Sequence, residues 1–235
     1  MATRRDGEVP SRPYLQLGVS SNVTYTYDES RKEGERITSV WVNGKPIDPK
    51  GTYSVGSGSF LIAGRDNFTE LAKGSKPVDS GRISLSAWVD WIKAHKTLKP
   101  DFAKRAVSLT TSLHEGTSRD TTFTLGKPAD KAVAPDTVDF TSKDAVVNTI
   151  MKAQIVQDDK TVDVATTPVK DGWSSVSVKV PTAKGLVSGE ATTVFTFPDS
   201  GTTVRFAAKL SVPSGDHPGG ACLLYTSDAA DEEDS

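Results

Sequence analysis

Two short runs near the start of the chain have the pattern of half-buried strands. Residues 22–27 (Asn-Val-Thr-Tyr-Thr-Tyr) alternate β-branched or aromatic residues with polar ones, and 37–42 (Ile-Thr-Ser-Val-Trp-Val) are similarly rich in strand formers. Asn43-Gly44 follows directly and favours a type I′ hairpin turn, because that turn needs positive φ at both central positions. Residues 53–55, after the turn Asp48-Pro-Lys-Gly, are expected to form a third strand.

The spacing of apolar residues changes after residue 84. Apolar side chains now recur at intervals of three and four, which predicts an amphipathic helix ending near His95; they are Leu85, Trp88, Val89 and Ile92. Basic residues in the last turn suit the negative end of the helix dipole. The apolar segment 106–109 closes this mixed α+β half.

The second half of the chain has many short runs of period two, separated by proline, glycine and aspartate. The strand candidates are 121–125, 137–140, 176–180, 191–197 and 204–212. This pattern indicates an all-β, immunoglobulin-like sandwich. Residues 143–152 fit either a helical turn or a strand. The boundary between the two halves is placed between Ser112 and Phe123, which gives domains at 1–112 and 113–213.

Composition and charge narrow the class of protein. The chain has 235 residues, 36% of them hydrophobic and 25% charged, which describes a globular protein. Its net charge of −2 argues against nucleic acid as the main partner, although residues 1–112 carry +5 and residues 113–235 carry −7. No apolar run is long enough to span a membrane. The single cysteine excludes an internal disulfide framework.

The end of the chain is unusual. Residues 214–221 look like a linker, and the string from Cys222 to Glu232 resembles the translation of a transposase-type sequencing adapter. We therefore expect 222–235 to be an adapter-derived tail on a fragment of a longer frame. The alternative is an acidic C-terminal tail.

One segment carries a functional signal. It is 59–68 (Ser-Phe-Leu-Ile-Ala-Gly-Arg-Asp-Asn-Phe), and taken by itself it has ordinary structural explanations. Asn67 fits the N-cap of a short helix with Glu70 at the third position, a capping box. Phe60 fits either a core position or a contact with a ligand.

Seven segments in order resemble the C-terminal, substrate-binding domain of the 5′-nucleotidase family. They are 13–18, 25–31, 34–40, 42–49, 52–55, 60–68 and 78–81, followed by the helix at Trp88. The resemblance covers about residues 12–110. It implies an α+β domain that is truncated at its N-terminal side, followed here by the immunoglobulin-like sandwich.

The resemblance also implies roles for residues of the 59–68 segment. Phe60 would stack on the nucleobase and Asp66 would accept hydrogen bonds from the ribose hydroxyls, while Gly64 and Asn67 belong to the same binding motif. Arg65 and Gly18 are further candidates. Arg65 stands where the family has a second glycine, and a positive φ there would make arginine costly. The family's second clamp phenylalanine would lie upstream of residue 1.

The family's catalytic centre has no counterpart here. It comprises Asp-x-His, Gly-Asn-His and His-x-His elements that bind two divalent metal ions, whereas this chain has only the separated His95, His114 and His217. The resemblance therefore implies that the metals belong to a missing N-terminal metallophosphoesterase domain, which would be this fragment's partner. We expect no metal or other cofactor on the fragment itself.

The leading hypothesis is the nucleoside-recognition part of an extracellular or cell-wall-associated 5′-nucleotidase, with the location inferred from the family. The alternative hypothesis is a non-catalytic nucleoside-binding or adhesive surface module. The resemblance implies that the parent protein is a phosphoric monoester hydrolase of the 5′-nucleotidase type, with no catalytic centre in this fragment.

Overall fold

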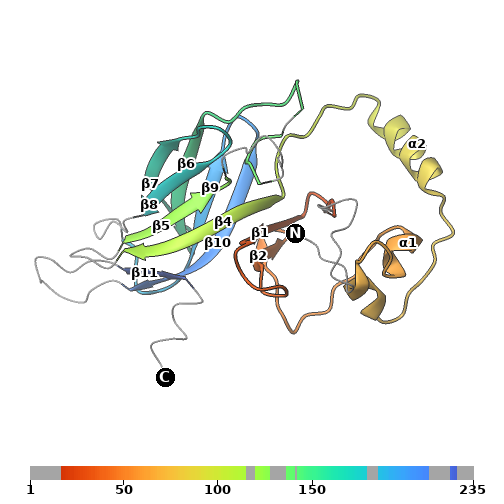
Figure 1. The fold of residues 1–235 in the computed structure, drawn as a ribbon, viewed down its shortest axis with the longest axis horizontal. Coiled ribbons are helices and arrows are strands. Elements are labelled where there is room, and N and C mark those ends of the chain that lie inside the picture. The colour runs from red at the N-terminus through yellow and green to blue at the C-terminus, as the bar shows by residue number, and fades with distance from the viewer. Residues whose placement is uncertain are drawn as a thin grey trace, which may run out of the picture. The chain divides into compact units, whose positions relative to one another are not determined.

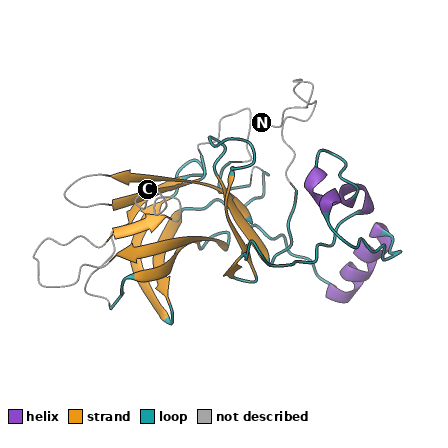
Figure 2. Cartoon of the chain, turned by 90° about the horizontal axis from the view of Figure 1, so that it is seen from below, coloured by secondary structure: helices purple, strands orange, loops and turns teal. Residues whose placement is uncertain are grey.

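The computed structural model describes residues 17–114, 120–127, 136–140, 142–178, 185–211 and 223–226 (Figure 1). Within them the chain is mostly strand, and the helices all fall between residues 48 and 101 (Figure 2). The strands are β1 Val23–Tyr27, β2 Ile37–Val42, β3 Lys45–Pro46, β4 Ala106–His114, β5 Asp120–Leu125, β6 Ile150–Gln157, β7 Lys160–Pro168, β8 Ser174–Val178, β9 Gly189–Phe197, β10 Thr202–Ser211 and β11 Leu223–Thr226. The helical elements are α1 Ser59–Ile62, the 3₁₀ helix η1 Thr69–Lys73 and α2 Ser84–His95.

The chain forms two compact units. One consists of Met1–Ile47 together with Phe102–Ser235, and the other is the continuous segment Asp48–Asp101. The first unit contains every strand of the described residues, and the second contains α1, η1 and α2. In sequence terms, the second unit is therefore an insertion between β3 and β4.

The first unit contains two β-sheets that contribute to one hydrophobic core. One sheet has the order β3-β2-β1-β4-β5-β8 and the other β11-β10-β9-β6-β7. β4 joins two parts of the six-stranded sheet because it is long enough to pair twice. Its first residues pair in parallel with β1 (Tyr25↔Ala106), and its later residues pair antiparallel with β5 (Leu109↔Leu125).

The predicted boundary between residues 112 and 113 therefore falls inside β4. Val107 and Leu109, which lie before it, are part of the same buried cluster as residues of β5 to β10. In the structure, the compact units divide at residues 47/48 and 101/102 instead.

The core of the first unit lies between the two sheets. Phe123 of β5 has no exposed surface, and its ring centroid lies 5.0 Å from that of Phe195 in β9 and 5.9 Å from that of Phe206 in β10. These rings come from opposite sheets, so they fix the sheets face to face as a β-sandwich. Buried residues alternate with exposed ones along β8 and with half-buried ones along β9, which is the period-two pattern expected from their sequences.

The N-terminal hairpin forms as predicted and packs on the sandwich. Asn43 and Gly44 have φ of 54° and 74°, as a type I′ turn requires. Trp41 of β2 is only 5% exposed, and its indole nitrogen donates a hydrogen bond to Ser39 Oγ at 2.7 Å. Ser39 Oγ in turn donates to the backbone carbonyl of Arg205 in β10, at 3.3 Å.

Polar contacts also join the loop 136–140 to β1 and to the residues just before β4. The Tyr27 hydroxyl donates to Asp136 Oδ1 at 2.5 Å, and Lys104 Nζ donates to the carbonyl of Thr137 at 2.5 Å. Burial lowers the pKa of Lys104, partly offset by nearby aspartates. Beyond the end of β1, Glu29 pairs with Lys127, and this hydrogen bond lowers the pKa of Glu29. The hairpin is therefore fixed to the rest of the first unit both by the buried side chain of Trp41 and by polar contacts such as that of Tyr27.

Two strand predictions were wrong, and four of the described strands were not predicted. Residues 53–55 and 137–140 have no strand pairing; the second is a turn whose Val138 is buried and donates its N–H to the carbonyl of Gly172 at 2.7 Å. The strands that were not predicted are β3, β6, β7 and β11, of which β6 and β7 form a hairpin. Of the ambiguous segment 143–152, only the last residues, from Ile150, are strand.

The predicted linker 214–221 lies outside the described residues, as does most of the predicted tail 222–235. The four tail residues that are described form β11, which pairs antiparallel with the end of β10 (Ala208↔Thr226). The adapter origin of this tail stays a prediction. Among the described helices, none is long and apolar enough to cross a membrane.

The sandwich core has one identifiable weak point. Within the described residues, Thr193 Oγ1 in β9 is fully buried and has no hydrogen-bond partner. An unsatisfied buried hydroxyl destabilises the folded state, so Thr193→Val should raise the free energy of unfolding by about 1 kcal/mol. Thr196→Val, at a half-exposed position of β9, should change it by less than about 0.5 kcal/mol. Urea denaturation measures both, and equal changes would contradict the explanation.

Candidate functional site

The segment 59–68 forms a short helix followed by a tight loop. Phe60 lies on α1, whose four residues include no buried side chain, and its ring is 56% exposed. In this structure Phe60 is therefore not part of a hydrophobic core. An exposed aromatic ring on a short helix is available to a ligand.

Gly64 ends α1 for a steric reason. Its φ is +76°, and a Cβ at this position would lie 3.1 Å from Cβ of Ala72, in the following helix η1. Any other residue would therefore be strained in its backbone and crowded against η1. This glycine shapes the turn that presents the next residues.

The φ angles of residues 65–67 show whether the backbone at position 65 is strained by an arginine. Positive φ occurs at Asp66 (53°) and Asn67 (66°), and Arg65 is not among the residues with positive φ. Arginine at position 65 thus carries no cost from a left-handed backbone. Aspartate and asparagine are the non-glycine residues that enter this region most readily.

The capping box predicted for Asn67 and Glu70 is wrong. The helix that follows is the 3₁₀ helix η1, its N-cap is Phe68, and no side chain caps it. Asn67 is in the left-handed conformation, whereas an N-cap residue has an extended backbone. Glu70 instead pairs with Lys73 at 2.5 Å.

The loop backbone is held in place while its polar side chains are left open. Gly64 N–H donates to the Leu61 carbonyl at 2.9 Å, Arg65 N–H to that of Phe60 at 3.3 Å, and Phe68 N–H to that of Arg65 at 3.2 Å. In the described part of the chain, no hydrogen bond or ion pair involves the side chains of Arg65, Asp66 or Asn67, and all three residues are exposed. The loop thus offers a cation, an anion and an amide on a defined backbone.

The remaining candidate position is elsewhere. Gly18 belongs to the other compact unit, and a Cβ there would have open space around it. Its position needs no glycine on steric grounds. Phe60, Gly64, Arg65, Asp66 and Asn67 therefore form the candidate site, which lies within the segment Asp48–Asp101 alone.

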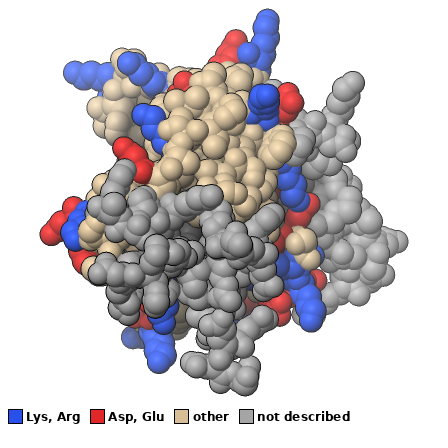
Figure 3. Space-filling model, turned by 90° about the vertical axis from the view of Figure 1, so that its left-hand side faces the viewer, with Lys and Arg blue, Asp and Glu red and all other residues tan. Residues whose placement is uncertain are grey.

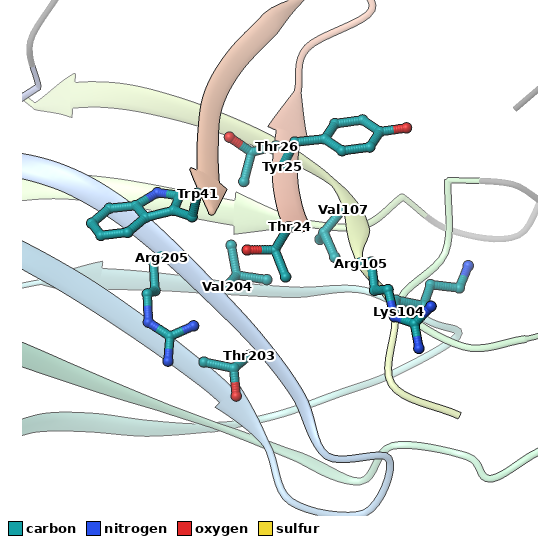
Figure 4. Close-up of a pocket in the computed structure, with 10 residues that line it drawn as sticks. All are labelled: Thr24, Tyr25, Thr26, Trp41, Lys104, Arg105, Val107, Thr203, Val204 and Arg205. Atoms are coloured by element: carbon teal, nitrogen blue, oxygen red, sulfur yellow. The ribbon is translucent and has the colours of Figure 1, made fainter. Parts of the chain in front are cut away.

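The first unit has a small hollow where two groups of strands pack together. It lies where β1 and β2 meet β10 and the start of β4, and its lining includes Trp41, Val107 and Val204 (Figure 4). Lys104, Arg105 and Arg205 also border it, but the hollow has no room for a ligand. It was not foreseen from the sequence, because the segments that line it lie far apart along the chain.

Among the described residues, no group of three or more His, Cys, Asp or Glu side chains is placed to hold a metal ion. His95 stacks on Trp91 with ring centroids 4.0 Å apart, and its Nδ1 lies 2.8 Å from the carbonyl of Trp91.

On the face shown in Figure 3, the described basic and acidic side chains are interspersed.

Comparisons with known proteins point to one family for the first part of the chain. Residues 3–73 match the family model described as 5′-nucleotidase, C-terminal domain. This stretch resembles a 5′-nucleotidase C-terminal domain. The match contains the whole candidate loop but stops at residue 73, whereas the resemblance in the sequence extends to about residue 110.

One similar protein is a 5′-nucleotidase-related protein from Glossina morsitans morsitans. It is 34% identical over 101 residues, which cover 40% of this chain and 18% of the relative. The chain thus matches less than a fifth of that protein's length. No solved structure matches this chain.

Proposed function

We propose that this chain is the nucleoside-recognition portion of a 5′-nucleotidase-type phosphohydrolase. The observation that carries the proposal is the loop 60–68, in which an exposed aromatic ring and an unpaired carboxylate stand on a hydrogen-bonded backbone. The similarity of residues 3–73 to the C-terminal domain of 5′-nucleotidases supports the same assignment.

The chemistry of the loop suits a nucleoside. The ring of Phe60 offers a flat apolar face, and base–aromatic stacking is worth about 1–3 kcal/mol per base whatever the base. The carboxylate of Asp66 accepts hydrogen bonds from two neighbouring hydroxyls, which are charge-assisted and therefore strong. Together the two groups distinguish a nucleoside from a free sugar phosphate or a free base.

Phosphate release would then be the task of another domain. In this proposal an N-terminal metallophosphoesterase domain with two divalent metals completes the enzyme, which acts outside the cell or at its wall. That domain would hold both metals, and the part of this chain would be to bind and orient the nucleoside. Phosphate release from nucleoside 5′-phosphates by the complete protein distinguishes this function from the alternative, a non-catalytic nucleoside-binding or adhesive module.

We propose an immunoglobulin-like classification for the sandwich. Taken in sequence order from β4 as strands A, B, C, C′, E, F and G, the sheets read A-B-E and G-F-C-C′. This placement of B and E against G, F and C is that of immunoglobulin-type sandwiches, with β7 in the position of C′. Deletion of the sandwich distinguishes a structural role from an adhesive one.

Phe60→Ala tests the base contact. In NMR-detected titrations of the whole chain, this substitution should weaken the binding of adenosine 5′-monophosphate by about tenfold, because it removes a stacking energy of about 1–3 kcal/mol. The binding of ribose 5-phosphate, which has no base, should not change.

Trp88→Ala is the matched control, since Trp88 is a similarly exposed aromatic residue of the same unit that lies outside the loop. It should leave both affinities unchanged. Equal weakening of both ligands by Phe60→Ala would exclude the stacking role.

A further inference from the structure

Arg65 is the charged residue of the loop that the proposed function does not use. It lies between Gly64, which sets the turn, and Asp66, which is assigned to the ribose. The segment Asp48–Asp101 contains one other arginine, Arg82, and that one pairs with Asp90 at 2.7 Å. Arg65 is exposed and, among the described residues, has neither an ion pair nor a side-chain hydrogen bond.

The position of Arg65 next to Asp66 in the chain suggests which part of the nucleoside it contacts. If Asp66 accepts from the 2′ and 3′ hydroxyls, the hydroxyl edge of the ribose lies at Asp66, and the exposed side chain of Arg65, the preceding residue, can reach a group on that edge. The 5′ carbon, with its phosphate, is attached to C4′ and projects from the opposite face of the ring. A cation at Arg65 therefore complements an anion on the 2′,3′ edge rather than the 5′-phosphate.

We propose that Arg65 binds a second phosphate carried by the ribose. The favoured ligand is then a nucleoside 5′-phosphate with a further phosphate on its 2′ or 3′ oxygen. This inference rests on the proposed function, because Asp66 and Phe60 must place the nucleoside first. Arginine suits the task, since its planar guanidinium binds phosphate through two parallel hydrogen bonds.

The pairing of opposite charges supports this ligand class. A ribose with one hydroxyl and one phosphate offers a donor to Asp66 and an anion to Arg65, so both side chains gain a partner. Dinucleotide-binding sites use the same two groups as alternatives: a carboxylate binds the 2′-hydroxyl of NAD, whereas a nearby arginine accommodates the 2′-phosphate of NADP. An unmodified ribose would leave Arg65 unpaired.

The test compares three ligands on the whole chain by NMR-detected titration at low salt. They are adenosine 5′-monophosphate, adenosine 2′,5′-bisphosphate and adenosine 3′,5′-bisphosphate. At least one bisphosphate should bind about tenfold more tightly than the monophosphate, a factor equivalent to about 1.4 kcal/mol. The advantage should shrink as salt is added, because the site is exposed.

Three variants identify the residue responsible. Arg65→Gln should abolish the advantage of the bisphosphate, Arg65→Lys should retain part of it, and Arg82→Gln should retain all of it. The preferred bisphosphate shows which ribose oxygen lies next to Arg65.

The outcomes separate this inference from the proposed function. Equal affinities for all three ligands, or an advantage that survives in Arg65→Gln, would overturn the role of Arg65 and leave nucleoside recognition intact. Absence of binding by all three ligands would overturn both.

Discussion

A chain that begins at Leu113 is expected to lose cooperative thermal unfolding, whereas a chain that begins at Phe102 should keep it. The first chain retains only the last two residues of β4. It lacks Val107 and Leu109, which are 3% and 2% exposed, and burial of each such side chain is worth about 1.5–3 kcal/mol. It also leaves most of one edge of β5 without its partner strand.

Calorimetry of the two chains measures this effect. The chain from Phe102 is the control, because it also lacks the β1–β2 hairpin but has β4 complete. If both chains melt with the same sharp transition, β4 contributes little to the sandwich and the predicted boundary at residue 112 becomes a sound place to divide the protein.

Phe123→Ala is the point substitution with the largest expected effect. The side chain is fully buried and packs against Phe195 and Phe206 of the opposite sheet. Replacing a buried phenylalanine with alanine removes apolar burial and leaves a cavity, so the free energy of unfolding should fall by about 3–5 kcal/mol. This loss is a large fraction of the roughly 5–15 kcal/mol by which a folded domain is stable.

Phe140→Ala provides the comparison for this substitution. Its ring is 43% exposed, and its contacts include Phe102 and the ammonium of Lys104, 5.1 Å from the ring centroid. Its loss should cost about 1 kcal/mol or less, the usual worth of an exposed cation–π contact. Denaturant curves of both variants give the two values, and similar losses would show that the rings between the sheets do not dominate the core.

Much of the local structure followed from sequence periodicity. The helix predicted to end near His95 is α2, and the strands at 121–125, 191–197 and 204–212 are present with slightly different ends. These segments have a clear period and, for the hairpin at Asn43-Gly44, a turn with a specific backbone requirement. For such segments the local sequence is enough to predict the secondary structure.

The errors have a common physical cause, which is that a strand exists only if it finds a partner. Residues 53–55 have the composition of a strand but are exposed and unpaired. The β6–β7 hairpin was missed although Met151, Ala153 and Ile155 alternate with polar residues, because the turn at Asp158 has no glycine. Pairing between distant segments, such as β1 with β4, leaves no local signal.

The sequence could predict which residues belong to the candidate loop, but not their exposure, backbone conformation or side-chain partners. Its residues are consecutive, so the sequence alone brings Phe60 and Asp66 close together. Whether the ring is exposed, whether Arg65 needs a positive φ, and whether the side chains already have partners depend on the folded backbone. Those three facts underlie both proposals.

The insertion of Asp48–Asp101 between β3 and β4 has a consequence for proteolysis. This segment contains no buried residue, and exposed segments are where proteases cut first. A cut within it would break the chain but not the sheet, because β1 and β4 would remain paired and Trp41 would remain buried. Two cuts would release the loop that carries Phe60 and Asp66 and leave a folded remainder. A stable proteolytic core of this protein would thus have lost the residues proposed to bind the nucleoside.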